Sequence, residues 1–346
     1  MKALTVTGLE KFDLQEIEVP KVTKGKVRIK VSYVGICGSD LPRYFQGGVH
    51  QFPQILGHEF SGVIDKIGPG VENLEPGNRV VAAPLIPCGK CEMCLKGQPA
   101  LCTHYSFIGS REPGAMADYV VVPAVNCLKI PDSLSMKEAA VLEPLTVAIH
   151  GVERVKVHTG ATVMVLGAGT IGLLTVLTLN AIGAGKIIVV DLNDYKLEVA
   201  KEVGGSVVIN PSKMPLEEYF SEHEVPEVVF ETAGSSVTQK QALQYVKKFG
   251  KTVFIGTSTR DVKLEPELFE KILRGELEIT GSWMSYSAPF PGYEWEAGLQ
   301  FMTKGKIDVR PLLKGIYKLE DKALPFERMI EANTDAIKLM YEINPE

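Results

Sequence analysis

Hydrophobic positions divide the chain into two stretches with different patterns. From residue 2 to about residue 122, short β-branched runs lie between Gly and Pro residues, which predicts an irregular, mainly β domain. The clearest predicted strands are residues 27–31, 62–64, 79–81 and 119–122. Near residue 135 the pattern changes, because residues 137–149 have helical apolar spacing and lead into a regular alternation of strand and helix.

The alternating stretch predicts a doubly wound α/β sheet. Apolar runs predict six parallel strands, at residues 162–166, 187–191, 207–209, 228–231, 252–255 and 277–280. Helices are expected at residues 171–182, 195–203 and 237–249, each ending near a Gly. Residues 161–185 carry no charge and are long enough to span a bilayer, but three glycines divide them into a strand and a helix, which favours a buried βα unit.

After Gly281 the alternation stops, which indicates that the chain leaves the sheet. Residues 295–302 and 325–332 are helix candidates that we expect to pack on the first domain. A chain of 346 residues exceeds the usual size of a single hydrophobic core. We therefore predict two domains: residues 1–143 with 286–346, and residues 144–285.

Composition and charge indicate a protein that acts on small molecules. Lys and Arg total 37 against 42 acidic residues, so the net charge of −5 gives no reason to expect nucleic acid or an anionic membrane as a partner. Residues 1–13 lack the apolar core and the cleavage site of a secretory signal. A cytoplasmic location is the expectation.

A glycine-rich turn predicts a dinucleotide site. Gly167, Gly169 and Gly172 form a G-x-G-x-x-G pattern that follows a predicted strand and opens a predicted helix. These glycines permit a tight turn, close approach of a pyrophosphate and close helix packing. Asp191 ends the next strand, 19 residues after Gly172, where a carboxylate binds ribose hydroxyls and repels a 2′-phosphate, so NAD is favoured over NADP. A helix-capping role for Asp191 is the alternative.

Four closely spaced cysteines predict a structural metal site within residues 87–103. Cys88, Cys91, Cys94 and Cys102 are separated by two, two and seven residues. Four thiolates with no open position are typical of structural zinc, whose binding energy folds the loop. An iron–sulfur cluster and disulfides remain as alternatives. Cys127 lies outside the group and is interpreted as a small buried apolar residue.

Cys37, and His58 followed by Glu59, suggest a second metal site, although a lone Cys or His is more often structural. With the four-cysteine segment, the glycine-rich turn and Asp191, they stand in an order that resembles the zinc-containing medium-chain alcohol and polyol dehydrogenases over the whole chain. The resemblance implies a GroES-like catalytic domain, a Rossmann domain and two zinc ions per chain. It implies Cys37, His58 and Glu143 as catalytic zinc ligands, with Glu59 able to exchange with Glu143 or water. The further cofactor contacts that it implies are Thr170, Ile171, Lys196, Thr232, Ile255 and Gly256.

The family resemblance also implies a reaction, hydride transfer from a secondary alcohol of a polyol phosphate to NAD. Ser39 is the candidate to take the substrate proton. Many relatives have a His three residues later, where this chain has Pro42, so the proton leaves through water, the nicotinamide ribose or His50. Arg43 and Arg111 are candidates for a substrate phosphate, with surface ion pairs as the alternative for each.

The stretch around Trp283 is unusual for the wider family, so Trp283 is a further substrate candidate. An unphosphorylated polyol or another secondary alcohol stays open as substrate, and a non-catalytic nucleotide-binding protein is the remote alternative. A homodimer or homotetramer is expected from the same resemblance.

Overall fold

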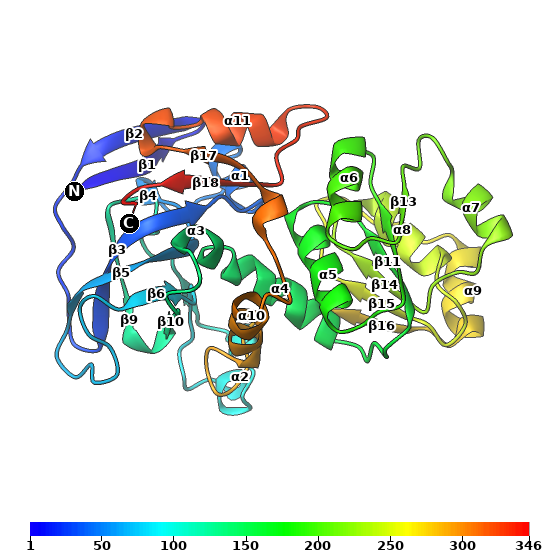
Figure 1. Ribbon diagram of the computed structural model, residues 1–346, viewed down its shortest axis with the longest axis horizontal. Coiled ribbons are helices and arrows are strands. Elements are labelled where there is room, and N and C mark those ends of the chain that lie inside the picture. The colour runs from blue at the N-terminus through cyan, green and yellow to red at the C-terminus, as the bar shows by residue number, and fades with distance from the viewer. Residues whose placement is uncertain (346) are drawn as a thin grey trace. The chain divides into compact units, whose positions relative to one another are not determined.

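The computed structural model describes residues 1–345, which form two compact units (Figure 1). Unit 1 comprises Met1–Glu143, Ser285–Thr303 and the segment that begins at Leu313. Unit 2 comprises Pro144–Met284 and Lys304–Leu312. The sequence pattern predicts the last of these segments in the first domain. In the structure it joins unit 2, because its short helix η3 (Arg310–Leu312) packs on α6 (Asp194–Glu202).

Unit 1 is built on a seven-stranded sheet with β3 (Lys26–Gly35) inside it. The strand order is β10-β6-β5-β3-β18-β17, and β9 also pairs with β3. A second sheet has the order β2-β1-β4 and a third pairs β7 with β8. The other strands are β1 (Lys2–Gly8), β2 (Lys11–Glu16), β4 (Gln54–Ile55), β5 (Glu59–Ile67), β6 (Arg79–Ala82), β7 (Leu85–Ile86), β8 (Ser106–Phe107), β9 (Tyr119–Pro123), β10 (Cys127–Lys129), β17 (Leu313–Tyr317) and β18 (Lys338–Glu342).

The core of unit 1 follows from the alternation of apolar side chains along these strands. In β3, Val27, Ile29 and Val31 are fully buried while the residues between them face the surface more. The C-terminal strand β18 pairs antiparallel with β3, so residues more than 300 positions apart share one sheet. Through this pairing, the C-terminal part of the chain joins the same unit as the N-terminal strands.

The helix predicted at residues 137–149 is two helices, α3 (Met136–Ala139) and α4 (Leu142–Glu153). Pro144 falls in the first turn of α4, where a residue without an amide hydrogen costs no helical bond. The break therefore places Glu143 in the first turn of a helix, where the helix dipole favours a carboxylate. Most of α4 belongs to unit 2, which begins at Pro144. Besides α3, the helices of unit 1 are α1 (Asp40–Phe45), α2 (Glu92–Leu95), η1 (Pro99–Leu101), η2 (Ala124–Asn126), α10 (Tyr293–Thr303), η4 (Leu319–Asp321) and α11 (Leu324–Ile330).

Unit 2 is a six-stranded parallel sheet in the order β13-β12-β11-β14-β15-β16, the Rossmann arrangement. All six strands fall within one residue of the predicted bounds. They are β11 (Thr162–Leu166), β12 (Lys186–Val190), β13 (Val207–Ile209), β14 (Val228–Glu231), β15 (Lys251–Phe254) and β16 (Glu278–Gly281). Residues 163–166 of β11 are fully buried, as expected of a central parallel strand covered on both faces.

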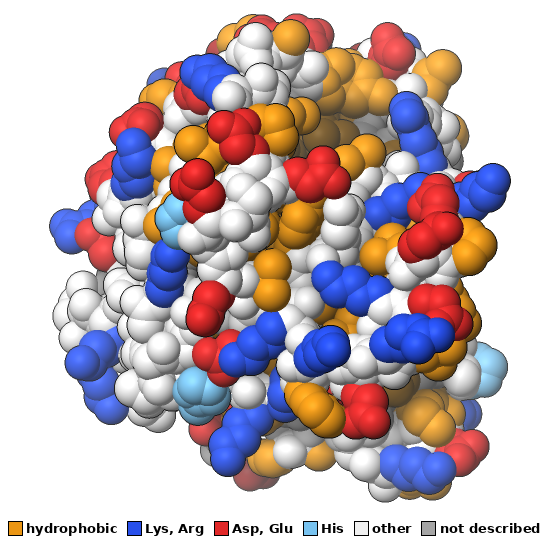
Figure 2. All heavy atoms as spheres, turned by 90° about the vertical axis from the view of Figure 1, so that its right-hand side faces the viewer, with side chains coloured by type: hydrophobic (Ala, Val, Ile, Leu, Met, Phe, Trp, Pro, Cys, Tyr) orange, Lys and Arg blue, Asp and Glu red, His pale blue; other side chains and the backbone are white. Residues whose placement is uncertain are grey.

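Helix α5 (Thr170–Ala181) packs against β11 and β12, α6 packs against β12 and β13, and α8 (Ser236–Gln244) packs against β14 and β15. The sequence pattern missed α7 (Leu216–Glu222) and α9 (Pro266–Gly275). Within residues 1–345, no helix combines the length and the apolar character needed to cross a bilayer. On the face shown in Figure 2, Lys and Arg side chains lie among Asp and Glu side chains.

Candidate active site and metal centres

One end of the β3–β5 strand pair brings Cys37, His58 and Glu59 together. The strands pair antiparallel with Gly35 opposite Glu59, and Cys37 and His58 lie just outside the two paired ends. The thiol sulfur, an imidazole nitrogen and a carboxylate oxygen all lie within 4.8 Å of one another. His58 and Glu59 are almost completely buried. Sulfur, nitrogen and oxygen donors at this spacing suit one divalent ion, and thiolate with imidazole favours zinc.

The surroundings of these donors fit a bound cation. Burial raises the pKa of the Cys37 thiol to about 11, and the carboxylates of Glu59 and Asp40 add to the increase. Within residues 1–345 the buried Nδ1 of His58 has no hydrogen-bond partner, and Asp40 Oδ1 lies 3.7 Å away. Buried polar atoms are rarely left unpartnered, and negative charge gathered around a thiol is costly unless a cation offsets it. The residues present therefore fit zinc.

Glu143 lies close to this cluster but outside the tight group. It is 9% exposed. Burial raises the pKa of its carboxyl group to about 8; His58 opposes the shift, and Glu59 and Cys37 add to it, so all three residues are within electrostatic reach. Among residues 1–345, the group whose donor atoms lie within 4.8 Å contains Glu59 and not Glu143. The assignment of Glu143 as third ligand stays a prediction.

Ser39 and Arg43 lie on one turn beside Cys37. Ser39 is exposed, and its backbone amide points to Cys37 Sγ at 3.5 Å. Arg43 Nη1 donates to Ser39 Oγ at 3.1 Å and to Asp40 Oδ1 at 2.8 Å. Asp40 is fully buried, so this guanidinium already neutralises a carboxylate of the protein. Arg43 is thus held beside Ser39, which weakens its case as the phosphate ligand.

The segment that carries Arg111 packs directly against His58. The ring of Phe107 meets the His58 ring edge-on, with centroids 5.5 Å apart. Arg111 donates its backbone amide to the Phe107 carbonyl at 2.9 Å, and its exposed guanidinium lies over the Tyr105 ring. Nη1 of Arg111 donates a hydrogen bond to the Tyr105 carbonyl. His50 is exposed in the loop after α1.

The sequence pattern missed a buried charged residue beside the cluster, Lys338, at the start of β18. Among residues 1–345 it is the one buried lysine, at 1% exposed. Its Nζ donates to Glu59 Oε2 at 2.6 Å and to the Ile36 carbonyl at 3.0 Å. The only signal in the sequence is a charged residue inside the apolar run 336–341.

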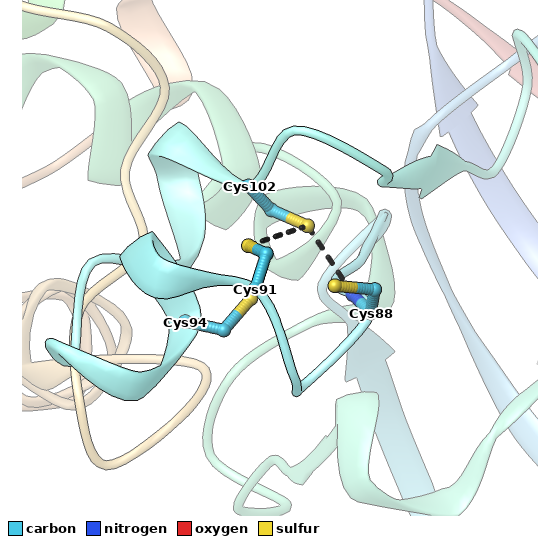
Figure 3. Close-up of side chains that lie close together, drawn as sticks. All are labelled: Cys88, Cys91, Cys94 and Cys102. Carbon is cyan, nitrogen blue, oxygen red and sulfur yellow. Dashed lines mark hydrogen bonds between the residues drawn. The ribbon is translucent and has the colours of Figure 1, made fainter.

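The four cysteines of the predicted structural site converge (Figure 3). The sulfur atoms of Cys88, Cys91, Cys94 and Cys102 all lie within 4.8 Å of one another, and those of Cys91 and Cys102 are 3.8 Å apart. The Cys88 amide points to Cys102 Sγ at 3.3 Å. Hydrogen bonds from the backbone amides of Cys94 and Thr103 lower the pKa of Cys91 to about 5, which favours the thiolate.

The chain segment around these cysteines has little core of its own. Helix α2 contains no buried residue, and Leu95 and Leu101 are 76% and 50% exposed. A segment that buries so little apolar surface needs another source of folding energy, which a closed tetrahedral metal site supplies. Burial raises the pKa of the separate Cys127 to about 12, in line with an apolar role.

The glycine-rich turn of unit 2 has the geometry of a phosphate site. Gly167 has φ +101°, which favours glycine. Gly169 is the N-cap of α5, and a Cβ there would meet no atom within 4 Å, so the backbone is open to an approaching group. A Cβ on Gly172 would lie 1.9 Å from the Gly167 carbonyl oxygen, so strand and helix pack closely. Thr170 and Ile171 begin the helix, where free amides and the helix dipole attract anions.

Asp191 lies directly beside this turn, after β12. Its Oδ2 accepts the Ala168 amide at 2.6 Å and its Oδ1 accepts the Asn193 amide at 2.8 Å. Thr232, after β14, donates to the carbonyls of Leu166 and Gly167. β11 and β14 are adjacent, and the chain order reverses between them, so these residues surround the topological switch point where nucleotides bind.

The other predicted cofactor residues lie in the same unit. Lys196 is in the first turn of α6, while Ile255 and Gly256 follow β15, the neighbour of β14. Trp283, the proposed substrate residue, belongs to unit 2 as well and is 53% exposed.

A nucleotide-binding sheet in one unit and a buried sulfur, nitrogen and oxygen donor set in the other define a metal-dependent oxidoreductase of the two-domain type. Two known protein families match the chain and support this class. Residues 23–132 match the alcohol dehydrogenase GroES-like domain, and residues 170–304 match the zinc-binding dehydrogenase family.

Relatives and solved structures extend the match over nearly the whole chain. Galactitol 1-phosphate 5-dehydrogenase of Escherichia coli K12 is 39% identical over 302 residues, which cover 86% of this chain and 87% of the relative. Sorbitol dehydrogenase of Bacillus subtilis 168 is 34% identical over 98% of this chain and 96% of its own length. The crystal structure of galactitol-1-phosphate dehydrogenase from Escherichia coli has a TM-score of 0.94 at 35% identity, covering 99% of this chain and all of that one. The chain belongs to the zinc-dependent alcohol and polyol dehydrogenases.

Proposed function

We propose that the protein oxidises a secondary alcohol of a polyol phosphate, such as galactitol 1-phosphate, to the corresponding keto-sugar phosphate and reduces NAD. The observation that carries the proposal is the buried Cys37–His58–Glu59 cluster with Glu143 beside it. The similarity to galactitol 1-phosphate 5-dehydrogenase over 86% of the chain supports a polyol phosphate as substrate.

In this proposal Cys37, His58 and Glu143 hold a catalytic zinc, and Glu59 exchanges with Glu143 or water. When bound, this zinc supplies Lewis-acid stabilisation of negative charge on the substrate oxygen. A second zinc belongs to Cys88, Cys91, Cys94 and Cys102. Ser39 accepts the substrate proton at its hydroxyl, whose oxygen is already oriented by Arg43. Because Pro42 carries no proton, the proton leaves through water, the nicotinamide ribose or His50.

NAD is assigned to unit 2 through the glycine-rich turn and Asp191. We expect Asp191→Ala to raise the KM for NAD by roughly tenfold to a hundredfold. A hydrogen bond to a charged group contributes about 1.5–3 kcal/mol, and this contribution to NAD binding would be lost. Discrimination against NADP should fall as well, because the negative charge that repels a 2′-phosphate is gone. Steady-state kinetics with both cofactors measure this.

Two further variants control the Asp191 experiment. Asp191→Asn keeps an oxygen for the Ala168 amide but loses the charge, so it should relax discrimination with a smaller effect on the turn. Asp308→Ala, in a residue of unit 2 that pairs with Arg310, should behave as wild type. An unchanged NADP to NAD ratio in Asp191→Ala would remove the ribose role.

Arg111 is the better candidate for the substrate phosphate, because Arg43 is already paired with Asp40. Arg111→Ala should raise the KM for a polyol phosphate by about tenfold to a hundredfold, the value of a lost charged hydrogen bond. The KM for the unphosphorylated polyol should stay within about twofold, so the same variant provides its own control. Arg43→Ala should lower kcat/KM for the phosphorylated and the unphosphorylated polyol by the same factor, because it removes the hydrogen bond that orients Ser39. An Arg111→Ala enzyme with an unchanged KM for the phosphate refutes the assignment.

The second candidate substrate is an unphosphorylated polyol, favoured by the 34% identity to sorbitol dehydrogenase. NADH formation across a panel of polyols, polyol phosphates and simple secondary alcohols, with identification of the product, tests both. A kcat/KM for galactitol 1-phosphate at least about a hundredfold above that for galactitol or sorbitol supports the first proposal, and the reverse order supports the second. A homodimer or homotetramer in the cytoplasm completes the proposal.

A further inference from the structure

Lys338 and Glu59 form a buried ion pair at the edge of the metal cluster. The side chains of both residues are 2% exposed, and Nζ lies 2.6 Å from Oε2. Removing an ammonium group and a carboxylate from water is expensive, and such a pair is retained only where its geometry is good. Here the second partner of Nζ is the carbonyl of Ile36, the residue before Cys37.

The backbone around the pair is arranged to hold it. The Ile36 amide donates to the Leu339 carbonyl at 2.9 Å, which ties β18 to the segment that leads into Cys37. Gly35 lies opposite Glu59, and a Cβ on Gly35 would lie 2.3 Å from Glu59 Oε2. The absence of a side chain at residue 35 therefore makes room for the carboxylate in the position where Lys338 reaches it.

Lys338 also balances the charge of the cluster. Cys37, Glu59, Glu143 and Asp40 are the acidic groups, and Asp40 is neutralised by Arg43. With Cys37 and Glu143 as anionic ligands, one Zn²⁺ brings their sum to zero, and Lys338 then cancels Glu59. Without Lys338, Glu59 is a buried negative charge whose nearest compensation is the metal itself.

We infer that Lys338 is a positioning residue that keeps Glu59 a displaceable neighbour of the catalytic zinc and not a permanent ligand. The ammonium group of Lys338 binds Oε2 of Glu59 and so competes with the zinc ion for this carboxylate. One coordination position of the zinc then stays free for a substrate oxygen. The inference rests on the proposed function, because it takes Cys37, His58 and Glu143 as the permanent ligands. Nothing in the reaction passes through Lys338 itself.

Loss of Lys338 should have two opposite effects: the catalytic site should bind zinc more tightly, and turnover should fall. In Lys338→Met, Glu59 is free to bind the ion with both oxygens. We expect zinc to leave the catalytic site roughly tenfold more slowly and kcat/KM for the polyol substrate to fall about tenfold to a hundredfold, the usual range for groups that orient metal ligands. A residue that only stabilised the fold would have the opposite effect on zinc, because a loosened site releases metal faster.

Zinc release from the full-length holoenzyme to the chelating dye 4-(2-pyridylazo)resorcinol tests this. The kinetic phase of zinc release that is missing in His58→Ala is assigned to the catalytic site. Lys338→Arg keeps the charge and the donor and should release zinc within about threefold of wild type. The double variant Glu59→Gln/Lys338→Met should lose the slowing, since the carboxylate that would capture the ion is gone. Lys2→Met is the matched control: Lys2 pairs with Glu320 at 2.7 Å, but both side chains are 52% exposed.

The outcomes separate the inference from the proposed function. Slower zinc release in Lys338→Met that disappears in the double variant supports the role of Lys338. Equal or faster release in Lys338→Met, with a thermal unfolding midpoint close to wild type, overturns it while leaving the zinc assignment intact. If the wild-type enzyme has no zinc phase that depends on His58, the proposed function itself fails. Should Lys338→Met not fold, the Lys338→Arg and double variants decide the question by the same release rates.

Discussion

His58→Ala is expected to reduce turnover at least about a thousandfold, equivalent to some 4 kcal/mol of transition-state stabilisation. The imidazole is 4% exposed and supplies the nitrogen of the cluster with Cys37 and Glu59, so no nearby water replaces it well. The zinc content should fall from two per chain to one, because the four-cysteine site is separate. NAD affinity should stay within about twofold, since the nucleotide contacts belong to unit 2. Turnover assays, metal analysis and NAD titration measure the three effects.

The matched control replaces an exposed histidine. His158 is 61% exposed in unit 2 and pairs with Glu227 at 2.7 Å. His158→Ala should keep two zinc ions and near wild-type turnover. A His58→Ala enzyme that retained both zinc ions, or that kept more than about a tenth of the wild-type kcat, would be inconsistent with a metal role for this residue.

Cys102→Ser is expected to have its main effect on folding. Cys102 is 4% exposed. Its sulfur accepts a hydrogen bond from the Cys88 amide and contacts the sulfur of Cys91. Loss of one ligand should remove the structural zinc, and because the segment has little core, the apparent Tm should fall by roughly 10 °C, as about 4 kcal/mol does in a domain of 150–250 residues. Soluble yield should fall with it. Differential scanning calorimetry and zinc analysis test this.

Cys127→Ser provides the comparison for the structural site. Cys127 packs against the core of unit 1 but lies outside the cluster, so its replacement should keep two zinc ions and cost only about 1 kcal/mol for the buried hydroxyl. Iron and acid-labile sulfide in the wild-type protein would instead identify the four-cysteine site as an iron–sulfur cluster. A Cys102→Ser protein with both zinc ions would exclude the four-cysteine assignment.

The Rossmann sheet could be predicted from sequence almost residue by residue. Its inner strands are buried on both faces, so they read as continuous apolar runs such as residues 162–166, and glycines mark their ends. The position of Asp191 beside the turn followed from the same regularity. The four-cysteine site could also be predicted from sequence, because the short spacing keeps these residues close together in any fold of the chain.

The parts that could not be predicted depend on contacts between distant segments. Lys338 reaches Glu59 across 279 residues, and no local pattern records that β18 inserts beside β3. The pairing of Arg43 with Asp40 was missed because the sequence did not reveal that Asp40 is buried. The helix break before Glu143 shows the limit of periodicity, since residues 137–149 keep helical spacing across two helices and Pro144 is the only sign of the restart.

Turnover is expected to depend on one of two zinc ions, the one held by the cluster around Cys37 and His58. Stepwise removal of zinc from the wild-type enzyme by a chelator, with metal content and NADH formation measured on the same samples, tests it most directly. Activity should disappear as the content falls from two zinc ions per chain to one, and addition of Zn²⁺ should restore it. Full turnover in a protein that has lost the His58-dependent zinc would contradict the claim.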